Sequence, residues 1–322
     1  MTKRLLIFFL YDKDGIVDDY AIYFLNSMRQ FCSEIMVVVN GFLSEEGKSK
    51  LNECSNQILI RENKGFDSYA YKTGIESYGY EKIKEYDELI LANFTMFGPI
   101  FPLNEMFEKM DNKKYIDLWG ITKHPSTDNV FAGIKVKEHI QSNFLVFRKS
   151  ILSDDSFKEF WTSLKQPTTY EEAVGFYELR ATDYFEKRGF KSDCYINLGK
   201  YFNNSEDIYF YYTYDQVKND RIPFIKRRIF SVKKDILEHN INGGIVNLLN
   251  YLEEKTNYNV NLIYNNVKRC YLNNINVKNT KNQYIKYKIK QFIIPLKWNH
   301  YAQKQACAKE MSKFIEILKD KV

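Results

Sequence analysis

Residues 57–72 read QILIRENKGFDSYAYK, and this stretch decides the fold class. The apolar run 57–60 is typical of a buried strand, and the spacing of apolar residues over 69–78 predicts a helix directly after it. Gly65 allows a tight turn between the two, and Asp67 can cap the helix. Such a joint places polar groups at the crevice where open α/β sheets bind ligands. An ordinary strand–turn–helix joint has the same pattern, so the flanking segments must decide between the two.

The flanking segments repeat the alternation of strand and helix. Apolar runs predict strands at 4–11, 34–40, 88–92, 118–122 and 142–147, and amphipathic spacing predicts helices at 19–31, 44–53 and 170–188. Strands that alternate with helices over short connections form a largely parallel sheet with crossover helices. We therefore expect an α/β fold with a Rossmann-type, mostly parallel sheet flanked by helices.

Length and composition narrow the class of protein. A chain of 322 residues exceeds one typical domain, which favours one large domain with an appendage. The apolar run 5–10 is too short for a signal peptide, and no apolar stretch approaches the roughly 20 residues that span a bilayer. Five scattered cysteines without a CxxC pair indicate neither a zinc site nor a disulfide framework. We expect a cytoplasmic protein.

The charge is distributed unevenly along the chain. Residues 218–322 contain 21 Lys and Arg against 8 Asp and Glu, a net charge of +13, which leaves −7 for residues 1–217 of a chain whose total is +6. A basic end behind an acidic body suggests an anionic partner, either a membrane surface or nucleic acid. A solvated basic helical face is the alternative interpretation.

Polar residues follow the predicted strands at their carboxyl ends, and these ends meet at one edge of a parallel sheet. In chain order this edge carries Tyr11, Asn40, Asn63, Gly65, Asp67, Asn93 and Thr95. Each alone is more often a turn former than a ligand, and only the set indicates a ligand site. The free N–H groups at the start of the following helix could face a phosphate.

Glu178 is the candidate catalytic residue. It lies within the predicted helix 170–188, which ends at Gly189. A carboxylate on a helix beside a sheet edge could act as general base on a sugar hydroxyl. A surface Glu favoured by the helix dipole is the alternative.

Several motifs occur together in one order. They are NKGFD at 63–67, FGP at 97–99, WGIT at 119–122, HIQSNFLVF at 139–147, YE at 177–178 and PFIKR at 223–227. In order and spacing the chain resembles the rhamnan synthesis protein F family, a group of rhamnosyltransferases of bacterial surface polysaccharides, over roughly residues 1–232. It is similar, more remotely, to the GT-A glycosyltransferase pattern. The resemblance implies a GT-A-like domain at 1–232 and leaves 233–322 as a basic, mostly helical region.

The resemblance implies a reaction and a set of site residues. The reaction is inverting transfer of a sugar from a nucleotide-diphosphate sugar, dTDP-rhamnose above all, to a saccharide or polyprenyl-linked acceptor of a growing polysaccharide, with Glu178 as general base. The residues at the strand ends together with Lys72 would bind the nucleotide sugar. The acceptor site would contain Trp119, His139 and Gln141, for each of which a packed strand end is the alternative. Lys226 and Arg227 would bind phosphate, and anchoring of a loop is the alternative for them.

The chain departs from the GT-A pattern at the metal position. Where GT-A enzymes have Asp-x-Asp and the rhamnan family has Asn-Asp, this chain has Asn93-Phe94-Thr95. Mg²⁺ and Mn²⁺ prefer charged oxygen donors and phosphate. Metal independence, with Lys72 or Lys226 neutralising the diphosphate, a metal held by other carboxylates such as Asp67, and a weakened enzyme all stay open. We favour a weak or dispensable metal.

The basic carboxyl-terminal region suggests where the protein works. A dozen Lys and Arg residues, each contributing about 1 kcal/mol near an anionic surface, can retain a domain at the inner face of the cell membrane. Residues 285–298 are the best candidate for lying in the interface. Two other functions stay open, a catalytically inactive scaffold of a polysaccharide assembly complex and a nucleic-acid-binding module. The second leaves the polar strand ends unexplained, so we expect no nucleic acid partner.

Overall fold

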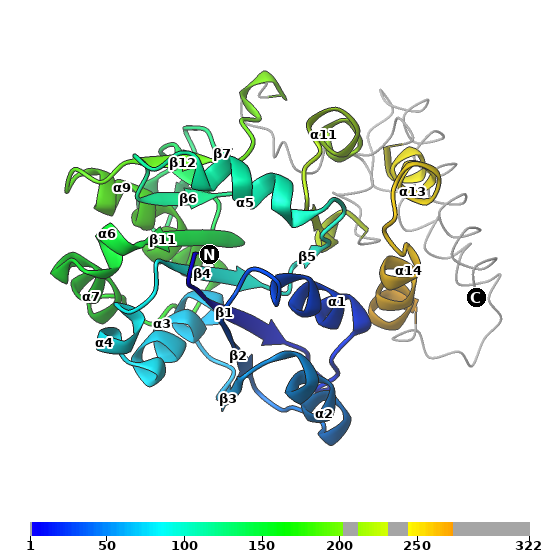
Figure 1. The fold of residues 1–322 in the computed structure, drawn as a ribbon, viewed down its shortest axis with the longest axis horizontal. Coiled ribbons are helices and arrows are strands. Elements are labelled where there is room, and N and C mark those ends of the chain that lie inside the picture. The colour runs from blue at the N-terminus through cyan, green and yellow to red at the C-terminus, as the bar shows by residue number, and fades with distance from the viewer. Residues whose placement is uncertain (1, 202–211, 231–243, 273–322) are drawn as a thin grey trace. The chain divides into compact units, whose positions relative to one another are not determined.

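A computed structural model describes residues 2–201, 212–230 and 244–272 (Figure 1). The chain forms two compact units, which we describe separately. The first unit comprises residues 1–96 and 102–206, and the second unit comprises residues 97–101 and 207–322. The predicted division at residue 232 falls among residues 231–243, outside the described part of the chain.

The first unit is built on one seven-stranded sheet. Its strands, in spatial order, are β12 (Ser192–Cys194), β6 (Leu118–Gly120), β11 (Phe144–Arg148), β4 (Glu88–Asn93), β1 (Arg4–Tyr11), β2 (Glu34–Asn40) and β3 (Gln57–Arg61). Every neighbouring pair is parallel except those made by β11, which runs antiparallel to both β4 and β6. The predicted α/β fold with a mostly parallel sheet is confirmed.

Helices cover both faces of this sheet (Figure 1). On one face lie α3 (Phe66–Tyr78), α4 (Tyr80–Ile83), α6 (Lys149–Leu152), α7 (Asp155–Thr162) and α9 (Leu179–Glu186), whose apolar residues share one core with alternate residues of the strands. On the other face lie α1 (Asp19–Met28), α2 (Glu45–Cys54) and α5 (Leu103–Asp111). Here Phe24 of α1 stacks on Phe8 of β1, and Phe107 of α5 meets Trp119 of β6 edge to face. The central strands are therefore buried on both faces, which explains their continuous apolar runs.

Several elements differ from the sequence-based expectation. The predicted strand 118–122 ends at Gly120, and the predicted strand 142–147 starts at Phe144. The first predicted helix ends at Met28, before 29–31. The helix after β3 starts at Phe66, because Gly65 (φ 74°) and Phe66 (φ 54°) make the turn in the left-handed region. The predicted helix 170–188 is interrupted: α8 (Tyr170–Ala173) passes through a π-helical turn, η1 (Val174–Glu178), before α9.

A buried ion network joins the strands at the amino end of β4. Glu88 is 2% exposed and accepts from Arg4 Nε at 2.6 Å, Arg148 Nε at 3.0 Å and Trp119 Nε1 at 3.2 Å. Arg4 also donates to Asp111 of α5 at 2.5 Å. A buried charge costs several kcal/mol unless its partners are complete, and here each carboxylate oxygen has a cationic donor.

A small excursion connects β6 to β11. It contains β7 (Lys123–His124), which pairs with β10 (His139–Ile140), and the hairpin of β8 (Val130–Phe131) and β9 (Ile134–Lys135). Ala132 (φ 49°) and Gly133 (φ 78°) form the hairpin turn. The hairpin approaches η1 closely, since a Cβ on Gly175 would lie 2.8 Å from Phe131 O.

The second unit is mostly helical where it is described. It contains α11 (Thr213–Asp220), β13 (Ile225–Lys226), η3 (Arg227–Phe230), α13 (Gly244–Lys255), α14 (Asn261–Val267) and the π-turn η4 (Lys268–Leu272). Segment 97–101 belongs to it: Phe97 of β5 (Met96–Phe97) packs on Phe230, and Ile100 N donates to Pro223 O at 2.8 Å. Residues 285–298, the predicted interfacial segment, lie outside the described residues.

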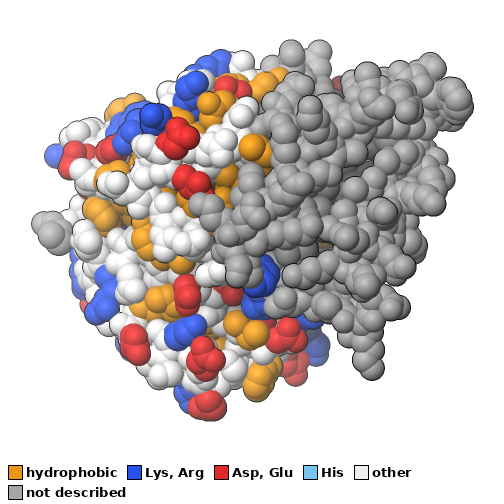
Figure 2. Space-filling view, turned by 90° about the vertical axis from the view of Figure 1, so that its right-hand side faces the viewer, with side chains coloured by type: hydrophobic (Ala, Val, Ile, Leu, Met, Phe, Trp, Pro, Cys, Tyr) orange, Lys and Arg blue, Asp and Glu red, His pale blue; other side chains and the backbone are white. Residues whose placement is uncertain are grey.

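On the described part of the face in Figure 2, side chains of both charges are interspersed with apolar ones. Within the described ranges, none of the helices combines the length and the apolarity that crossing a bilayer requires. Association with a membrane surface stays a prediction.

Gly74 tests how tightly α3 packs on the sheet. A Cβ at this position would lie 2.9 Å from Val38 Cγ2 and 3.0 Å from Ile7 Cγ2. Replacing Gly by Ala within a helix normally gains about 1 kcal/mol, but overpacking costs about 1–3 kcal/mol. We expect Gly74→Ala to lower the free energy of unfolding in urea by about 1 kcal/mol, and exposed Ser77→Ala on the same helix to change it by less than about 0.5 kcal/mol. A Gly74→Ala protein more stable than the wild type would contradict this packing.

Candidate functional site

The turn after β3 is held in place by a buried amide. Asn40, at the end of β2, is fully buried; its Oδ1 accepts from Arg61 Nη1 at 2.6 Å, and its Nδ2 donates to Asn63 Oδ1 and Phe66 O at 3.5 Å. Arg61 Nη1 also donates to Lys64 O at 2.9 Å. The polar atoms of Asn40 therefore hold the turn, and its direct contact with a nucleotide stays a prediction.

Gly65 is required at this turn for two reasons. Its φ of 74° lies in the left-handed region, and a Cβ would lie 2.5 Å from Tyr69 Cβ. Phe66 follows in the same region, which is an outlier for a bulky residue, and is 39% exposed. Strained backbone of this kind concentrates at functional sites. Sequence reasoning missed Phe66, because an apolar residue after a Gly predicts packing.

Asp67 and Asn93 join the start of α3 to the end of β4. Asn93 Nδ2 donates to Asp67 Oδ2 at 3.1 Å, and Ser68 N donates to Asp67 Oδ1 at 2.8 Å. Asn93 Oδ1 accepts from Thr95 N at 3.1 Å and from Thr95 Oγ1 at 2.5 Å. Three of the predicted residues, Asp67, Asn93 and Thr95, thus form one hydrogen-bonded group, which we call the strand-end latch.

Glu178 is the last residue of η1. Its Oε2 accepts from Ser142 N at 3.0 Å and from Ser142 Oγ, and its Oε1 lies 3.5 Å from His139 Nε2. The side chain is 21% exposed, so the carboxylate is oriented from one side and reachable from another. A π-turn inside a helix often occurs at a functional site.

The two carboxylates of the site, Asp67 and Glu178, lie within electrostatic range of each other. Burial, and secondly the Glu178 carboxylate, raises the pKa of Asp67 to about 6. Burial raises the pKa of Tyr71 and of Tyr177 as well, and the nearby Asn93 side chain opposes the shift at Tyr71. The structure therefore brings together the strand-end latch and the candidate base from distant parts of the sequence.

The three residues predicted to bind an acceptor are buried and engaged elsewhere. His139 is 2% exposed, stacks on His124 with ring centroids 5.2 Å apart, and its Nδ1 lies 2.7 Å from Lys137 O. Gln141 is 6% exposed and accepts from Thr122 Oγ1 at 3.0 Å. Trp119 is fully buried and donates to Glu88. His139 thus lies beside Glu178, Gln141 joins two connections, and Trp119 belongs to the core; contact of any of the three with an acceptor stays a prediction.

Lys72 does not face the sheet edge. Its Nζ donates to Thr162 O at 3.1 Å and Leu164 O at 3.3 Å, carbonyls at the carboxyl end of α7. Unpaired carbonyls at a helix end need such donors. The ammonium therefore holds α7 to α3, and the role of Lys72 in neutralising a diphosphate stays a prediction.

The other predicted residues keep their roles as predictions. Tyr11 is half-buried at the end of β1, and Asn63 is exposed beyond β3. Lys226 and Arg227 belong to the second unit, where Arg227 Nε donates to Asn266 Oδ1 at 3.2 Å. Their contact with phosphate is not tested by these bonds.

Sequence reasoning missed Ser142 and Asn143, which precede β11. Ser142 orients Glu178, and Asn143 Oδ1 is buried without a hydrogen bond. They reach the polar edge because β11 runs antiparallel to β4, so that Phe144 pairs with Ala92. The polar pair directly before an apolar strand was the available signal, but the strand direction was needed to interpret it.

The latch is a poor fit for Mg²⁺ or Mn²⁺. Both ions prefer carboxylate and phosphate oxygens, whereas Asn93 presents an amide oxygen that already accepts two hydrogen bonds. Across the described ranges, no group of three or more His, Cys, Asp or Glu side chains could hold a metal ion.

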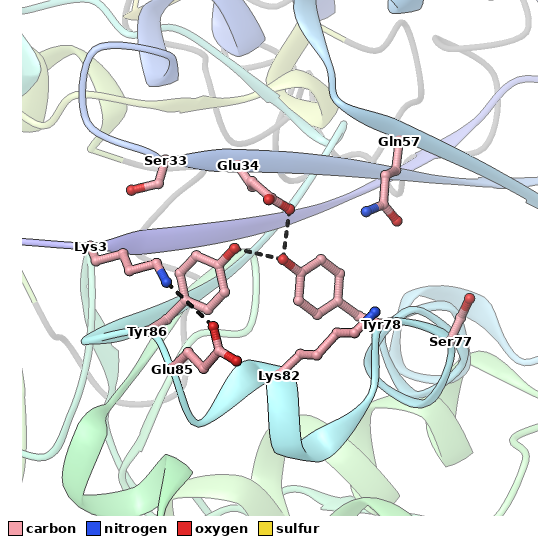
Figure 3. A pocket seen from close by; sticks show the side chains of 9 residues that line it. All are labelled: Lys3, Ser33, Glu34, Gln57, Ser77, Tyr78, Lys82, Glu85 and Tyr86. Carbon is pink, nitrogen blue, oxygen red and sulfur yellow. Dashed lines mark hydrogen bonds and ion pairs between the residues drawn. The ribbon is translucent and has the colours of Figure 1, made fainter.

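A groove of about 400 Å³ lies at the other edge of the sheet (Figure 3). It is lined at the amino ends of the strands by Lys3, Ser33, Glu34, Gln57, Ser77, Tyr78, Lys82, Glu85 and Tyr86. Tyr78 Oη donates to Glu34 Oε2 at 2.6 Å, and Tyr78 Oη and Tyr86 Oη lie 2.6 Å apart. The tyrosines are less than 10% exposed. These polar groups satisfy one another, so the groove does not compete with the carboxyl edge as a candidate site.

Comparison with known proteins assigns the family. The model of the family described as rhamnan synthesis protein F matches residues 35–317. The chain belongs to the rhamnan synthesis protein F family. The match spans β2 to β12 of the first unit and most of the second unit, and the resemblance drawn from the motifs is confirmed.

One curated relative of this member of the rhamnan synthesis protein F family has a low sequence identity to it. An uncharacterized protein, y4gN of Sinorhizobium fredii, is 25% identical over 162 residues, which are 48% of this chain and 39% of the relative. The chain thus spans about two fifths of the length of that relative.

Two solved structures are similar in part. Glucosyl-3-phosphoglycerate synthase from Mycobacterium tuberculosis, in complex with Mn²⁺, UDP and phosphoglyceric acid, is 9% identical with a TM-score of 0.33, over 47% of this chain and 57% of that one. 4-Diphosphocytidyl-2C-methyl-D-erythritol synthase from Anaerococcus prevotii is 12% identical with a TM-score of 0.40, over 67% and 96%. At these TM-scores the likeness assigns neither a function nor a site to this chain.

Lys72→Met tests the structural role of Lys72. Loss of the ammonium leaves the carbonyls of Thr162 and Leu164 without their donor, which costs about 1–3 kcal/mol of unfolding free energy. We expect a lower Tm and an affinity for nucleotide diphosphates within about twofold of the wild type. The control is Lys48→Met at an exposed position on α2, which should change neither the Tm nor the nucleotide affinity. A large loss of affinity at unchanged Tm would return Lys72 to the ligand site.

The raised pKa of Asp67 predicts how stability depends on pH. The folded state keeps the proton up to about pH 6, whereas an unfolded Asp releases it near pH 3.9. The contribution of Asp67 to stability therefore falls as the pH rises through this window. Relative to Asp67→Asn, we expect the wild type to lose about 2 kcal/mol of unfolding free energy between pH 4.5 and 7.5.

Asp154→Asn is the control, measured by the same urea titrations. Hydrogen bonds from Ser156 lower the pKa of Asp154, so its contribution is present above the unfolded value and disappears only below about pH 4. The difference between wild type and Asp154→Asn should therefore stay constant from pH 4.5 to 7.5. A constant difference for Asp67→Asn as well would contradict the buried Asp67 carboxyl.

Proposed function

We propose that the chain transfers a glycosyl group from a nucleotide-diphosphate sugar to a hydroxyl of a saccharide or lipid-linked acceptor. The observation that carries the proposal is the Glu178 carboxylate at the carboxyl edge of the sheet. Ser142 N donates to it, His139 Nε2 lies 3.5 Å from it, and its charge acts on the Asp67 carboxyl. Ligands of open α/β sheets bind at this edge. Membership in a rhamnan synthesis family supports rhamnose as the sugar and dTDP-rhamnose as the donor.

In the proposed step, the acceptor oxygen attacks the anomeric carbon and its proton passes to Glu178. The bond between the anomeric carbon and the diphosphate oxygen breaks, and its electron pair leaves with the nucleotide diphosphate. Ser142 already donates twice to Oε2, so we assign the proton to Oε1, which lies 3.5 Å from His139 Nε2. Attack from the face opposite the leaving group gives inversion.

The other side chains support this step. Asp67, fixed by Ser68 and Asn93, offers a carboxylate to sugar hydroxyls. Tyr11, Asn63 and the turn at Gly65 and Phe66 line the nucleotide side. The basic carboxyl-terminal region holds the protein at the inner face of the cell membrane, where a polyprenyl-linked acceptor lies.

Glu178→Gln tests the proposed reaction. A neutral amide keeps the shape of the side chain but cannot accept the proton, so we expect transfer to fall by about 10²–10⁴-fold with nucleotide affinity unchanged. The measurement is release of nucleotide diphosphate from a panel of nucleotide sugars with a saccharide acceptor, alongside calorimetry of nucleotide binding.

Glu171→Gln, at an exposed position on the preceding helix α8, is the matched control and should transfer at the wild-type rate. Unchanged transfer in Glu178→Gln would remove Glu178 as the base. Release from no sugar, together with no nucleotide binding by the wild type, would reject the enzyme and favour the scaffold.

A further inference from the structure

The strand-end latch leaves no free lone pair on the Asn93 amide for a cation at the end of β4. Asn93 is 4% exposed, and both lone pairs of its Oδ1 are used by Thr95 N and Thr95 Oγ1. Its Nδ2 donates a hydrogen bond to Asp67 Oδ2, so an N–H group and not an acceptor faces the Asp67 carboxylate. A divalent cation placed beside Asp67 would meet the partial positive charge of this amide.

Arg61 supplies positive charge at the same edge of the sheet. It is the last residue of β3, in register with Asn40 at the end of β2. Only its Nη1 is engaged, with Asn40 Oδ1 and Lys64 O, while Nε and Nη2 have no hydrogen bond or ion pair among the described residues. The guanidinium lies over the Tyr69 ring at 5.6 Å, and burial lowers its pKa, which for an arginine leaves the charge in place.

A half-buried guanidinium with two free nitrogens is suited to phosphate. Arginine binds phosphate oxygens through two parallel N–H donors, and it does so best where part of its geometry is already fixed. Here the hydrogen bonds to Asn40 Oδ1 and Lys64 O fix the position of Arg61 Nη1. The following N–H groups of that helix point toward the same edge.

We propose that Arg61 binds the diphosphate of the donor, and that Asn93 closes the position at which a divalent cation would otherwise neutralise it. This inference rests on the proposed function and deepens it by assigning the phosphate site. It assigns the charge to Arg61 at the end of β3, the strand that leads into Asp67 of the latch, and not to Lys72; β1 and β2 lie between β3 and β4 in the sheet.

The first experiment distinguishes the contribution of Arg61 to nucleotide binding from that of a metal ion, by calorimetry with dTDP and UDP. For the wild type, we expect affinity to change by less than about twofold, or about 0.3 of a decade in Kd, when 1 mM Mn²⁺ is replaced by EDTA. Arg61→Met should lose about tenfold or more in affinity, and Arg61→Lys should lose less, because it keeps the charge but not the paired donors. Lys64→Met, on the exposed turn, should bind like the wild type.

The second experiment uses Mn²⁺ alone, followed by electron paramagnetic resonance. The wild type should leave Mn²⁺ free at about 1 mM, whereas Asn93→Asp, which places a second carboxylate beside Asp67, should bind it at least about tenfold more tightly. This readout needs no catalytic activity. The Tm of each variant shows whether it has folded, and Arg61→Lys keeps the proposal testable if Arg61→Met unfolds.

The outcomes distinguish the inference from the function on which it rests. Nucleotide affinity that falls tenfold in EDTA and returns with Mn²⁺, tight Mn²⁺ binding by the wild type, or unchanged affinity in folded Arg61→Met and Arg61→Lys would each overturn the inference and leave the transferase standing. Absence of dTDP and UDP binding by the wild type, with and without Mn²⁺, would overturn both.

Discussion

The carboxylate of Glu88 is the interaction on which the rest of the first unit depends. It is buried at the amino end of β4 and joins Arg4 of β1, Arg148 of β11 and Trp119 of β6. A buried carboxylate is tolerated only with complete partners, and removal of one partner typically costs about 3–5 kcal/mol. The network therefore fixes which strands lie beside β4 and requires the end of β11, not its start, to lie at this edge.

That constraint has its consequence at the opposite edge. Because β11 ends beside Glu88, it runs antiparallel to β4, and its start lies beside Ala92 near the polar strand ends. Ser142, just before β11, thus comes within hydrogen-bonding distance of Glu178. A structural ion network at one end of the sheet in this way positions the candidate base at the other end, which connects stability with the proposed chemistry.

Much of the fold was predictable, and less of the site. The strands and the crossover helices follow from apolar periodicity, since burial on both faces demands continuous apolar runs. Asp67, Asn93 and Thr95 were predicted as one set and form one hydrogen-bonded group. The bonds that Lys72, Trp119 and Asn40 make were not predicted. A residue type shows which bonds a side chain can make, and the fold decides which partner it meets.

The sequence by itself determined the α/β class, the family and the polar carboxyl edge, because these depend on local periodicity and on motifs contiguous in the chain. Tertiary structure alone decided the direction of β11, the support of Glu178 by Ser142 and His139, and the closure of Asn93 by Thr95 and Asp67. Each of these joins groups that approach only after the sheet has assembled. The local sequence pattern carries no information on distances between residues that are far apart in the chain. In the first unit the buried ion network of Glu88, Arg4 and Arg148 helps to set these distances.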